Sequence, residues 1–324
     1  LAAGILRNIR LNNFVKVFIT MIFGRVLRFL ACLFMFYALS KTEIGIFEIW
    51  QSIPKCLPGI ILQLVLIPFL PNKMENSKKF HKKKLVAGIV LSVLFALILA
   101  CGIYLSDYYK ADFSEIERVL GKSENQLYEK SLLKEGTLCF LPKAGAKTGF
   151  VFYPGGKVQY NAYEPLLAKL AEKGIACFLV KMPFNLAVFN IDGAEEVLNQ
   201  FPEIENWFIG GHSLGGSMAA SFLGKNQFDI KGLILLASYS TVDFSESYIK
   251  LLSIFGSEDG VLNLEKYALY KENFPKSARE IVIQGGNHGG FGFYGTQEGD
   301  GTATISNEEQ TTKTADYIFE FIND

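Results

Sequence analysis

Six short apolar runs alternate with helical patterns along the second half of the chain, and this alternation restricts the possible folds more than any other feature. The runs lack the polar-apolar alternation of half-exposed strands, which favours strands buried on both faces of a parallel sheet. The helical patterns between them, and a last one at 308–322, predict a doubly wound α/β sheet. The runs lie at 149–153, 175–180, 206–211, 232–238, 249–256 and 280–286.

A serine flanked by glycines follows the third run, in the sequence GGHSLGG at 210–216. An apolar stretch precedes it and a helical pattern follows it, so Ser213 occupies a strand-to-helix corner. Such a corner strains the backbone, and we expect it to need Gly211 and Gly215 because they carry no Cβ. The arrangement is typical of the nucleophile elbow of an α/β-hydrolase, which presents the serine hydroxyl to substrate.

The choice of a general base is narrow because the chain contains 3 histidines. His81 lies in a lysine cluster, and we expect the elbow to point His212 away. His288 follows the last apolar run in the flexible turn GGNHGG, late in the domain, as the order of serine, acid and histidine in α/β-hydrolases requires. We therefore predict His288 as the base. For the acid that orients it we predict Asp259, which follows the fifth run.

Two other acids, Asp243 and Glu258, remain alternatives to Asp259. The oxyanion should be bound by the backbone N–H of Leu214, at the start of a helix, and by one N–H of the loop 153–157. In that loop Gly156 is the first choice and Lys157 the second.

The pocket is expected to be open, because about a dozen residues separate the fourth and fifth runs, where many α/β-hydrolases insert a lid domain. Loop side chains near the predicted triad are candidates for its walls. Apolar loop residues of this kind equally often pack over the sheet instead. The candidates are Lys157, Phe184, Asn185, Leu186, Phe291 and Phe293.

Five separated motifs resemble, in order, the bacterial α/β-hydrolases of the fold-5 group, which are related to dienelactone hydrolases. They are YPGGKVQYNAYEPLLAKLAEKG, VKMPFNLAVFN, GGHSLGGSMAA, GSEDGVLN and GGNHGGFGFYG. The resemblance covers about residues 137–324 and implies a triad of Ser213, Asp259 and His288 that hydrolyses an ester or related acyl bond. Dienelactone hydrolases carry cysteine at the nucleophile position, so the resemblance does not imply their substrate.

Membrane spans are predicted before this domain, since 50% of the residues are hydrophobic. Residues 85–105 form an uncharged stretch of about the 20 residues that cross a bilayer. Two weaker spans precede it, 14–39, which contains Arg25 and Arg28, and 51–70, which contains three prolines. Lysines cluster at 73–84, so the positive-inside rule keeps that loop in the cytoplasm and places the hydrolase domain outside.

The predicted organisation therefore has five parts. A membrane segment of two spans (1–72) is followed by a basic cytoplasmic loop (73–84), an anchor (85–105), a spacer helix with the start of a hairpin (106–136) and an α/β-hydrolase domain (137–324). Within the spacer, Ser114 and Glu117 form a capping-box pattern, and Gly121 should end the helix. Residues 125–132 and 137–142 are expected to pair as the hairpin.

The N-terminal part also carries a resemblance. Residues 10–71, which contain FGR and PGIILQLVLIPFL, resemble the last helices of a substrate-binding subunit of an energy-coupling-factor vitamin transporter. The chain begins with Leu1, whereas Met74, followed by lysines and the third span, is typical of the start of a signal-anchored protein. We expect a hydrolase that starts near Met74, joined to the tail of a neighbouring membrane protein.

Composition argues against other classes of function. The 32 basic and 32 acidic residues balance to a net charge of +0, which does not favour a nucleic-acid partner. The 5 cysteines are too scattered for a disulfide framework, and we expect Cys139 and Cys177 to be small buried hydrophobes. No motif predicts a metal or a cofactor.

The expected function is hydrolysis of a small-molecule or lipid acyl ester at the cell membrane, by a domain outside the cytoplasm. The sequence does not specify protein partners. Two other classes remain open, an inactive α/β-hydrolase that serves as a binding or scaffold module and a transporter subunit fused to a hydrolase.

Overall fold

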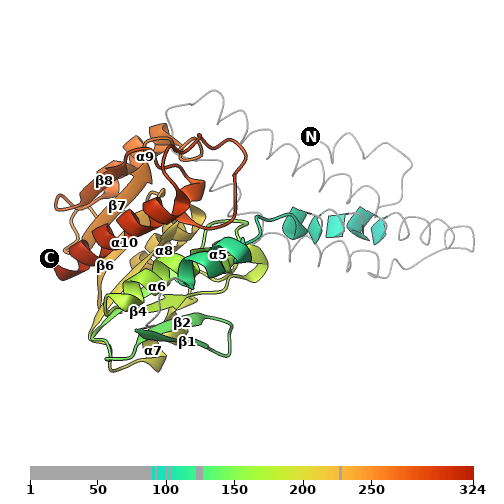
Figure 1. Ribbon diagram of the computed structural model, residues 1–324. Coiled ribbons are helices and arrows are strands. Elements are labelled where there is room, and N and C mark those ends of the chain that lie inside the picture. The colour runs from blue at the N-terminus through green and yellow to red at the C-terminus, as the bar shows by residue number, and fades with distance from the viewer. Residues whose placement is uncertain are drawn as a thin grey trace, which may run out of the picture. The chain divides into compact units, whose positions relative to one another are not determined.

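The chain divides into two compact units, Leu1–Ile103 and Tyr104–Asp324. The computed structural model describes the second unit at residues 104–121, 127–225 and 228–324, and in the first unit it describes helical residues at 90–91, 93–95, 97–98 and 101–102. The architecture below is that of the second unit (Figure 1).

The predicted spans 14–39 and 51–70, the basic loop 73–84 and the transporter resemblance at 10–71 all lie outside the described residues. The predicted anchor at 85–105 is described in part. In the portions that the structure describes, no helix combines the length and the apolar character needed to cross a membrane.

The second unit opens with helix α5 (Phe113–Leu120), which ends at Gly121 as predicted. Its N-terminus differs from the prediction. The cap is Asp112, whose carboxylate accepts a hydrogen bond from the N–H of Glu115 at 3.1 Å. Ser114 donates its hydroxyl to the same carboxylate at 2.6 Å instead of capping the helix. A carboxylate at the N-terminus also interacts favourably with the helix dipole, which explains the preference for Asp112.

Eight strands form one sheet, in the order β1-β2-β4-β3-β5-β6-β7-β8. The predicted hairpin is present as β1 (Tyr128–Leu132) and β2 (Leu138–Pro142), which pair antiparallel, and β2 also pairs antiparallel with β4. The remaining strands are parallel to one another. They are β3 (Thr148–Tyr153), β4 (Ala176–Leu179), β5 (Asn206–His212), β6 (Ile230–Leu236), β7 (Lys250–Gly256) and β8 (Arg279–Ile283).

Helices cover both faces of this sheet, as the alternation of runs predicts. Helices α6 and α10 lie side by side over one face, with α5 against α6 (Figure 1). On the other face α8 packs against β3, β5 and β6. Helices α7 and α9 bond to the same face as α8, α7 through Tyr153 of β3 and α9 through Ser253 of β7. The residues next to Tyr153 and Ser253 in the strands belong to the core on the opposite face. The bounds are α6 (Glu164–Glu172), α7 (Ala194–Gln200), α8 (Leu214–Lys225), α9 (Leu264–Tyr270) and α10 (Asn307–Asn323).

Short 3-10 helices lie in the connections between these elements. Four of them follow strands β3, β4 and β8, and one follows α9. They are η2 (Tyr160–Tyr163), η3 (Pro183–Asn185), η4 (Ala187–Phe189), η5 (Lys271–Asn273) and η6 (Gly289–Phe291). The connection from β6 to β7, residues 237–249, contains no helix or strand. A lid domain is therefore not inserted there.

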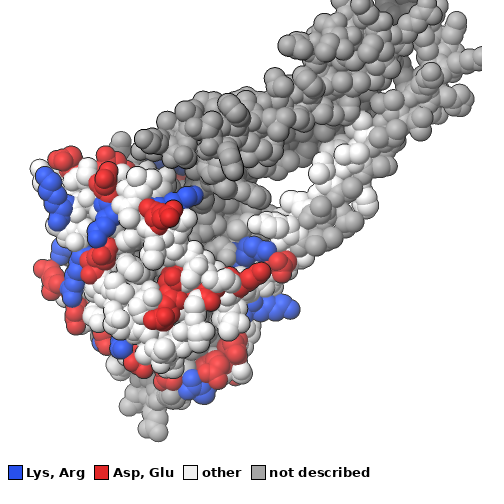
Figure 2. Space-filling view, turned by 90° about the horizontal axis from the view of Figure 1, so that it is seen from above, with Lys and Arg blue, Asp and Glu red and all other residues white. Residues whose placement is uncertain are grey.

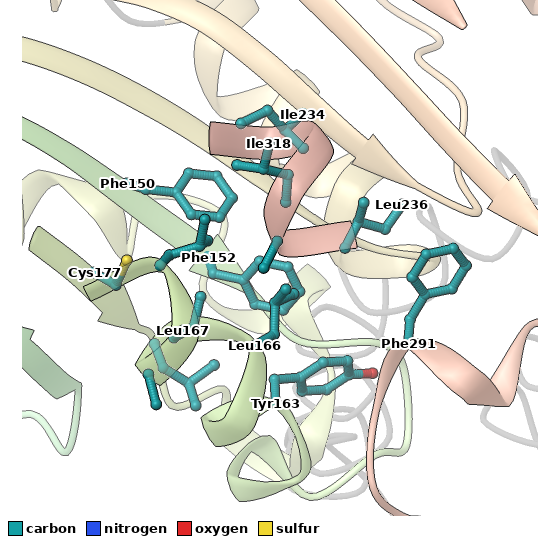
Figure 3. Close-up of a cluster of buried hydrophobic side chains, with 14 of the residues drawn as sticks. Phe150, Phe152, Tyr163, Leu166, Leu167, Cys177, Ile234, Leu236, Phe291 and Ile318 are labelled. Carbon is teal, nitrogen blue, oxygen red and sulfur yellow. The ribbon is translucent and has the colours of Figure 1, made fainter. Parts of the chain in front are cut away.

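The core on the α6 and α10 face is rich in aromatic side chains (Figure 3). Phe150 and Phe152 of β3 meet Leu166 and Leu167 of α6, and Ile318 closes the cluster from α10. All five are at most 1% exposed. Burial of an aromatic or leucine side chain contributes about 1.5–3 kcal/mol, so this face fixes the sheet that carries the site.

Cys139 on β2 and Cys177 on β4 are both 0% exposed. Burial raises the pKa of the Cys139 thiol to about 12 and that of Cys177 well above its ordinary value. The two thiols therefore stay protonated and pack as small hydrophobes, as predicted.

On the surface seen in Figure 2, acidic and basic side chains are interspersed.

Candidate active site

Ser213 stands between β5 and α8 with a backbone φ of 52°, a conformation that strains residues other than glycine. Neighbouring backbone holds the serine there. Its N–H donates to the carbonyl of Leu236, at the end of β6, at 2.8 Å. The Ser238 hydroxyl donates to the Ser213 carbonyl at 2.7 Å. The corner is thus tied to the adjacent strand and keeps the strained serine at the carboxyl edge of the sheet.

The glycines around Ser213 are required by space. A Cβ on Gly211 would lie 2.5 Å from the carbonyl oxygen of Tyr153, and a Cβ on Gly215 would lie 2.2 Å from the same oxygen. Real Cβ atoms do not approach backbone oxygens so closely. The geometry agrees with the expectation from GGHSLGG and explains why β3 and α8 can meet at the elbow.

The imidazole of His288 packs against that of His212, the residue before Ser213, and is oriented by Asp259. Its Nδ1 lies 2.9 Å from Oδ2 and 3.1 Å from Oδ1 of Asp259. The side chains are 2% and 1% exposed. Because the carboxylate accepts the proton of Nδ1, the other ring nitrogen, Nε2, is left as the basic atom. His288 Nε2 is buried and has no hydrogen-bond partner.

Backbone N–H groups of its own turn hold the Asp259 carboxylate in place. Its Oδ1 accepts hydrogen bonds from the N–H groups of Val261 at 2.9 Å and Leu262 at 2.7 Å. The two alternative acids bond elsewhere, Glu258 to the hydroxyl of Ser257 and Asp243 to the N–H of Ser245. The structure therefore brings Asp259, rather than either alternative, to the histidine.

The position of His212 differs from the prediction. Its ring does not point away from the site but packs against His288, with the ring centroids 4.5 Å apart. Nδ1 of His212 lies 2.8 Å from the hydroxyl of Tyr163, which itself accepts the N–H of Gly155 at 3.1 Å. The tautomer of His212 sets which of Nδ1 and the Tyr163 hydroxyl is the donor in this hydrogen bond. The prediction failed because the chain direction at the elbow does not specify where a strand-terminal side chain points.

Burial, together with the neighbouring His288 imidazole, holds the pKa of His212 well below its ordinary value, while the His288 backbone acts weakly in the opposite direction. The side chain is 1% exposed. His212 is thus a neutral, buried side chain that packs against His288. It is also hydrogen-bonded to Tyr163, which binds Gly155 in the loop after β3.

The loop after β3 contains the candidate oxyanion donors. The N–H of Lys157 is already bonded to the carbonyl of Asn185 at 2.7 Å, which leaves Gly156 as the available donor of the predicted two. Gly156 lies against Leu214, since a Cβ there would be 2.9 Å from Leu214 Cδ2. The first N–H groups of a helix have no partner within the helix, so the Leu214 N–H is also suited to an anion.

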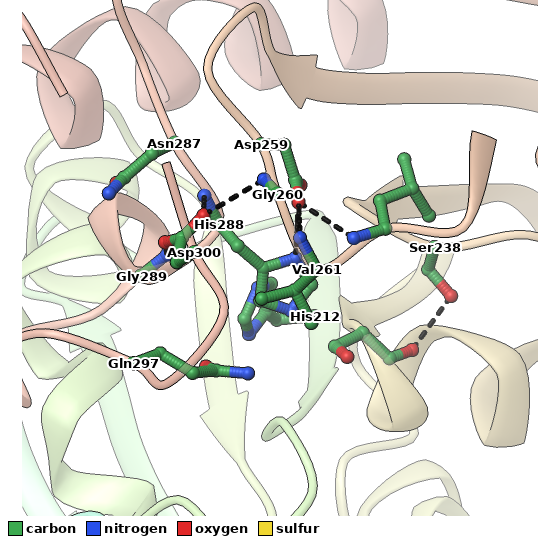
Figure 4. A network of polar contacts seen from close by, with 12 residues as sticks. His212, Ser238, Asp259, Gly260, Val261, Asn287, His288, Gly289, Gln297 and Asp300 are labelled. Atoms are coloured by element: carbon green, nitrogen blue, oxygen red, sulfur yellow. Dashed lines mark hydrogen bonds and ion pairs between the residues drawn. The ribbon is translucent and has the colours of Figure 1, made fainter. Parts of the chain in front are cut away.

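Asp300 is a residue of the site that sequence reasoning missed. Its Oδ1 accepts the N–H groups of Gly260 and His288, each at 3.1 Å, and its Oδ2 accepts the N–H of Gly289 at 2.7 Å (Figure 4). One carboxylate thus joins the turn that carries Asp259 to the turn that carries His288. The signal was the Gly-Asp-Gly turn in the long loop after His288, although turn aspartates usually bond only locally.

Asn287 and Gln310 complete the support of the histidine turn. The Gln310 side chain accepts the N–H of Asn287 at 3.1 Å and donates to its carbonyl at 2.8 Å. The Asn287 amide donates to the carbonyl of Gly301 and accepts the N–H of Gly290. Gln310 is 1% exposed, so its bonds form in a buried environment where they are costly to lose.

The predicted pocket walls fall into two groups. Phe291, which is labelled in Figure 3, and Phe293 are 1% and 3% exposed and belong to the core. The alternative role of packing over the sheet therefore accounts for both. Phe184 is 59% exposed. It borders a surface groove of about 580 Å³ that is not lined by Ser213, Asp259 or His288.

The remaining candidates include Asn185 and Lys157, whose backbone hydrogen bond joins the connection after β4 to the loop after β3. Phe184, Asn185 and Lys157 all have positive φ, between 54° and 57°, so this corner stores backbone strain. The Lys157 ammonium is paired with Asp107 at 2.9 Å. Leu186 lies near Gly156, 3.7 Å from the position of a Cβ there.

Comparison with protein families agrees with the observed fold. The model of the alpha/beta hydrolase family matches residues 149–312, half of the chain. The chain belongs to the alpha/beta hydrolase family. The match begins after the transporter resemblance at 10–71, which it therefore does not include. No curated protein matches this alpha/beta hydrolase.

Solved structures of similar fold include three esterases and hydrolases. Est1E from Butyrivibrio proteoclasticus matches with a TM-score of 0.44 and 14% identity over 61% of this chain and 99% of its own. Carboxyl esterase 2 from Tuber melanosporum matches with a TM-score of 0.46 and 14% identity over 62% and 89%. Dienelactone hydrolase from Anabaena variabilis matches with a TM-score of 0.44 and 14% identity over 61% and 98%.

Proposed function

We propose that this alpha/beta hydrolase is a serine hydrolase that cleaves an ester or a related acyl bond through Ser213, His288 and Asp259. The observation that carries the proposal is the buried pair of Asp259 and His288, joined at 2.9 Å. The His288 ring packs against His212, the residue before Ser213, whose φ is 52°. A buried histidine that donates Nδ1–H to a carboxylate and keeps Nε2 free is the arrangement that a general base needs.

In the proposed reaction, the Ser213 hydroxyl oxygen attacks the acyl carbonyl carbon while His288 Nε2 takes the hydroxyl proton. The carbonyl oxygen becomes an oxyanion in a tetrahedral intermediate. When the intermediate collapses, Nε2 returns the proton to the leaving alcohol, and the acyl group remains on Ser213. Water then attacks the acyl-enzyme with its proton taken by Nε2, which releases the acid and restores the serine. Asp259 stabilises the imidazolium in both steps.

The oxyanion would be bound by the N–H groups of Gly156 and Leu214. Two observations support this pair, the contact between the two residues and the engagement of Lys157 N–H by Asn185. Loss of one oxyanion donor costs about 3 to 4 kcal/mol of transition-state stabilisation. The donors are backbone groups fixed by the fold, so they need no reorganisation when the charge develops.

The substrate is proposed to be a small-molecule or lipid acyl ester, and Phe184 is proposed to contact it. Phe184 and Phe189 are 59% and 43% exposed, and their rings meet edge to face at 5.8 Å. Apolar side chains left at the rim beside the Gly156 loop favour a substrate with an apolar acyl group.

The hydrolase is further proposed to be anchored in the cell membrane by residues 85–105, with its catalytic domain outside the cytoplasm. The length of the uncharged stretch and the lysines at 73–84 support this. Fractionation of cells that express the full chain, followed by protease treatment of intact spheroplasts, tests it. Recovery of the protein in the soluble fraction, or protection of the catalytic domain from the protease, would contradict the proposal.

Labelling with a fluorophosphonate tests the catalytic proposal, because this reagent phosphonylates an activated serine. The full chain should be labelled and should hydrolyse p-nitrophenyl esters, and Ser213→Ala should do neither. A panel of esters with graded acyl length then measures the acyl preference. Labelling that persists in Ser213→Ala, or a folded wild-type protein that is not labelled, would defeat the serine-hydrolase assignment and favour a binding module.

A further inference from the structure

The segment of residues 104–112, which runs from the end of the predicted anchor to α5, forms part of the second compact unit, Tyr104–Asp324. We call it the linker segment. It pairs with the loop after β3 as a parallel bridge between Tyr109 and Val158. The Tyr109 N–H donates to the Lys157 carbonyl at 2.7 Å, and the Gln159 N–H donates to the Tyr109 carbonyl at 2.9 Å. The linker segment is thus bonded to the loop on both sides of Val158.

Side chains strengthen this attachment. The Lys157 ammonium pairs with Asp107 at 2.9 Å and lies 4.5 Å from the centre of the Tyr104 ring. Gln159 accepts the N–H of Ala111 at 3.1 Å through its side chain. Ion-pair, cation–π and hydrogen-bond contacts therefore all join the linker segment to residues 157–159.

The linker segment also contacts the loop that follows His288. The Asp112 N–H donates to the carbonyl of Phe293 at 2.8 Å. The Tyr109 hydroxyl accepts the N–H of Glu298 at 3.2 Å, and its ring packs against Tyr294 at 5.7 Å. One short segment therefore bonds to the loops on both sides of the proposed active site.

Lys157 connects these contacts to the proposed oxyanion donor, because it follows Gly156 in the chain. Its φ of 57° is strained for a residue with a side chain, and such a conformation persists only where its surroundings hold it. Tyr109 binds its carbonyl, Asn185 binds its N–H, and Asp107 binds its ammonium. The next residue, Val158, donates its N–H to the Gly155 carbonyl at 3.3 Å, and this carbonyl belongs to the same peptide unit as the N–H of Gly156. Holding Lys157 and Val158 in place therefore fixes where the Gly156 N–H points.

We propose that the linker segment positions the oxyanion loop, so that Asp107 and Tyr109 act as positioning residues for the Gly156 N–H. This inference rests on the proposed function, because Gly156 is a donor only if an oxyanion forms. It assigns a catalytic consequence to a stretch whose sequence predicts a spacer.

Two variants of the full chain test the proposal, Asp107→Asn and Tyr109→Ala. Asp107 is 83% exposed, so its substitution removes the pair with Lys157 without disturbing a core. The matched control is Asp229→Asn, because Asp229 is 81% exposed and pairs with Lys231 at 2.6 Å. For the tyrosine, the control is Tyr248→Ala, a fully exposed position. Asp107→Glu, which keeps the carboxylate, serves as the conservative variant.

The readouts are kcat and KM on a p-nitrophenyl ester, and the ratio of its rate to that of the matching thionoester. Sulfur is a weak hydrogen-bond acceptor, so a misplaced oxyanion donor slows the ester more than the thionoester. We expect kcat to fall about threefold in Asp107→Asn, in line with an exposed ion pair, and about tenfold in Tyr109→Ala. KM should stay within about twofold, the rate ratio should fall with kcat, and Asp107→Glu and both controls should match the wild type.

Unchanged kcat in Asp107→Asn and in a folded Tyr109→Ala, or a loss with an unchanged rate ratio, would overturn the inference and leave the serine-hydrolase proposal standing. Circular dichroism and thermal unfolding establish whether each variant folds. If Tyr109→Ala does not fold, the result for Asp107→Asn alone decides the test. A folded wild type without Ser213-dependent labelling or ester hydrolysis would instead defeat the proposed function, and this inference with it.

Discussion

The rings of His212 and His288 lie with their centroids 4.5 Å apart, both 1% exposed. Two buried imidazoles at this distance cannot both be protonated to the charged imidazolium form without strong repulsion. The two rings have different partners, since Nδ1 of His212 is hydrogen-bonded to the Tyr163 hydroxyl and Nδ1 of His288 to the Asp259 carboxylate. Burial and the neighbouring His288 imidazole keep His212 neutral, whereas Nδ1 of His288 is held by the Asp259 carboxylate.

This division predicts a pH dependence of stability. The pKa of His212 is held well below 6.5 by burial and by His288, so below about pH 6.5 the unfolded chain binds a proton there that the folded chain does not. A depressed folded-state pKa means that stability is lost as the pH falls below 6.5. The loss from this residue can reach about 1.4 kcal/mol per pH unit.

Urea unfolding of the wild type and of His212→Asn between about pH 9 and pH 5.5 measures this effect. The free energy of unfolding of the variant should fall less steeply with decreasing pH than that of the wild type. Above about pH 7.5 the two curves should run parallel, which is the internal control. Equal slopes over the whole range would show that His212 is not kept neutral.

The fold was largely predictable from the sequence because parallel strands and amphipathic helices have distinct periodicities. The alternation of apolar runs placed all six parallel strands within a few residues, and the helices that follow them also matched. The glycine-flanked serine could be placed at the β5 to α8 corner because that corner tolerates few other residues. These features depend on short stretches of local sequence.

The parts that sequence could not predict depend on contacts between distant residues. Asp300 lies 41 positions after Asp259, and nothing in its Gly-Asp-Gly turn indicates that its carboxylate reaches Gly260 at 3.1 Å. The same holds for Tyr109, whose hydroxyl meets Glu298 across 189 positions. Phe291 was a candidate wall because loops are usually exposed, whereas here η6, which contains it, packs against α10 and the side chain is 1% exposed.

Substitution of the three candidate acids distinguishes among them. Asp259→Asn should lower kcat by about 10⁴, because an amide at this position disfavours the tautomer with the proton on Nδ1. Glu258→Gln and Asp243→Asn should stay within about twofold of the wild type, since their side chains bond to Ser257 and Ser245. Steady-state kinetics on one ester suffices. If Asp243→Asn were the damaging change, the acid would have to be reassigned.

Asp300→Asn should impair both stability and turnover. The amide keeps the shape of the carboxylate but turns one acceptor into a donor, against the N–H groups of His288, Gly260 or Gly289. A hydrogen bond to a charged group contributes about 1.5–3 kcal/mol, and we expect a loss of that order in the free energy of unfolding, with kcat lower by about tenfold.

The control for Asp300→Asn is Asp316→Asn, whose carboxylate pairs with Lys173 on the surface at 2.9 Å and is 48% exposed. It should leave both kcat and stability close to those of the wild type. Chemical unfolding and kinetics on the same preparations give both quantities. Full activity in Asp300→Asn would mean that the turn of His288 is held without this carboxylate.

Gly215→Ala tests whether the elbow depends on close backbone approach. The new Cβ would lie 2.2 Å from the Tyr153 carbonyl oxygen and 2.3 Å from that of Pro154, so β3 and α8 would have to separate. We expect a loss of about 3 kcal/mol in the free energy of unfolding and no Ser213-dependent labelling. The matched change is Gly174→Ala, where φ is +93° but nothing lies within 4 Å of the new Cβ. There the cost is backbone strain alone, about 1 kcal/mol, and labelling should persist. A loss in Gly215→Ala no larger than that in Gly174→Ala, or labelling that persists in Gly215→Ala, would show that the contact between strand and helix does not explain the glycine at 215.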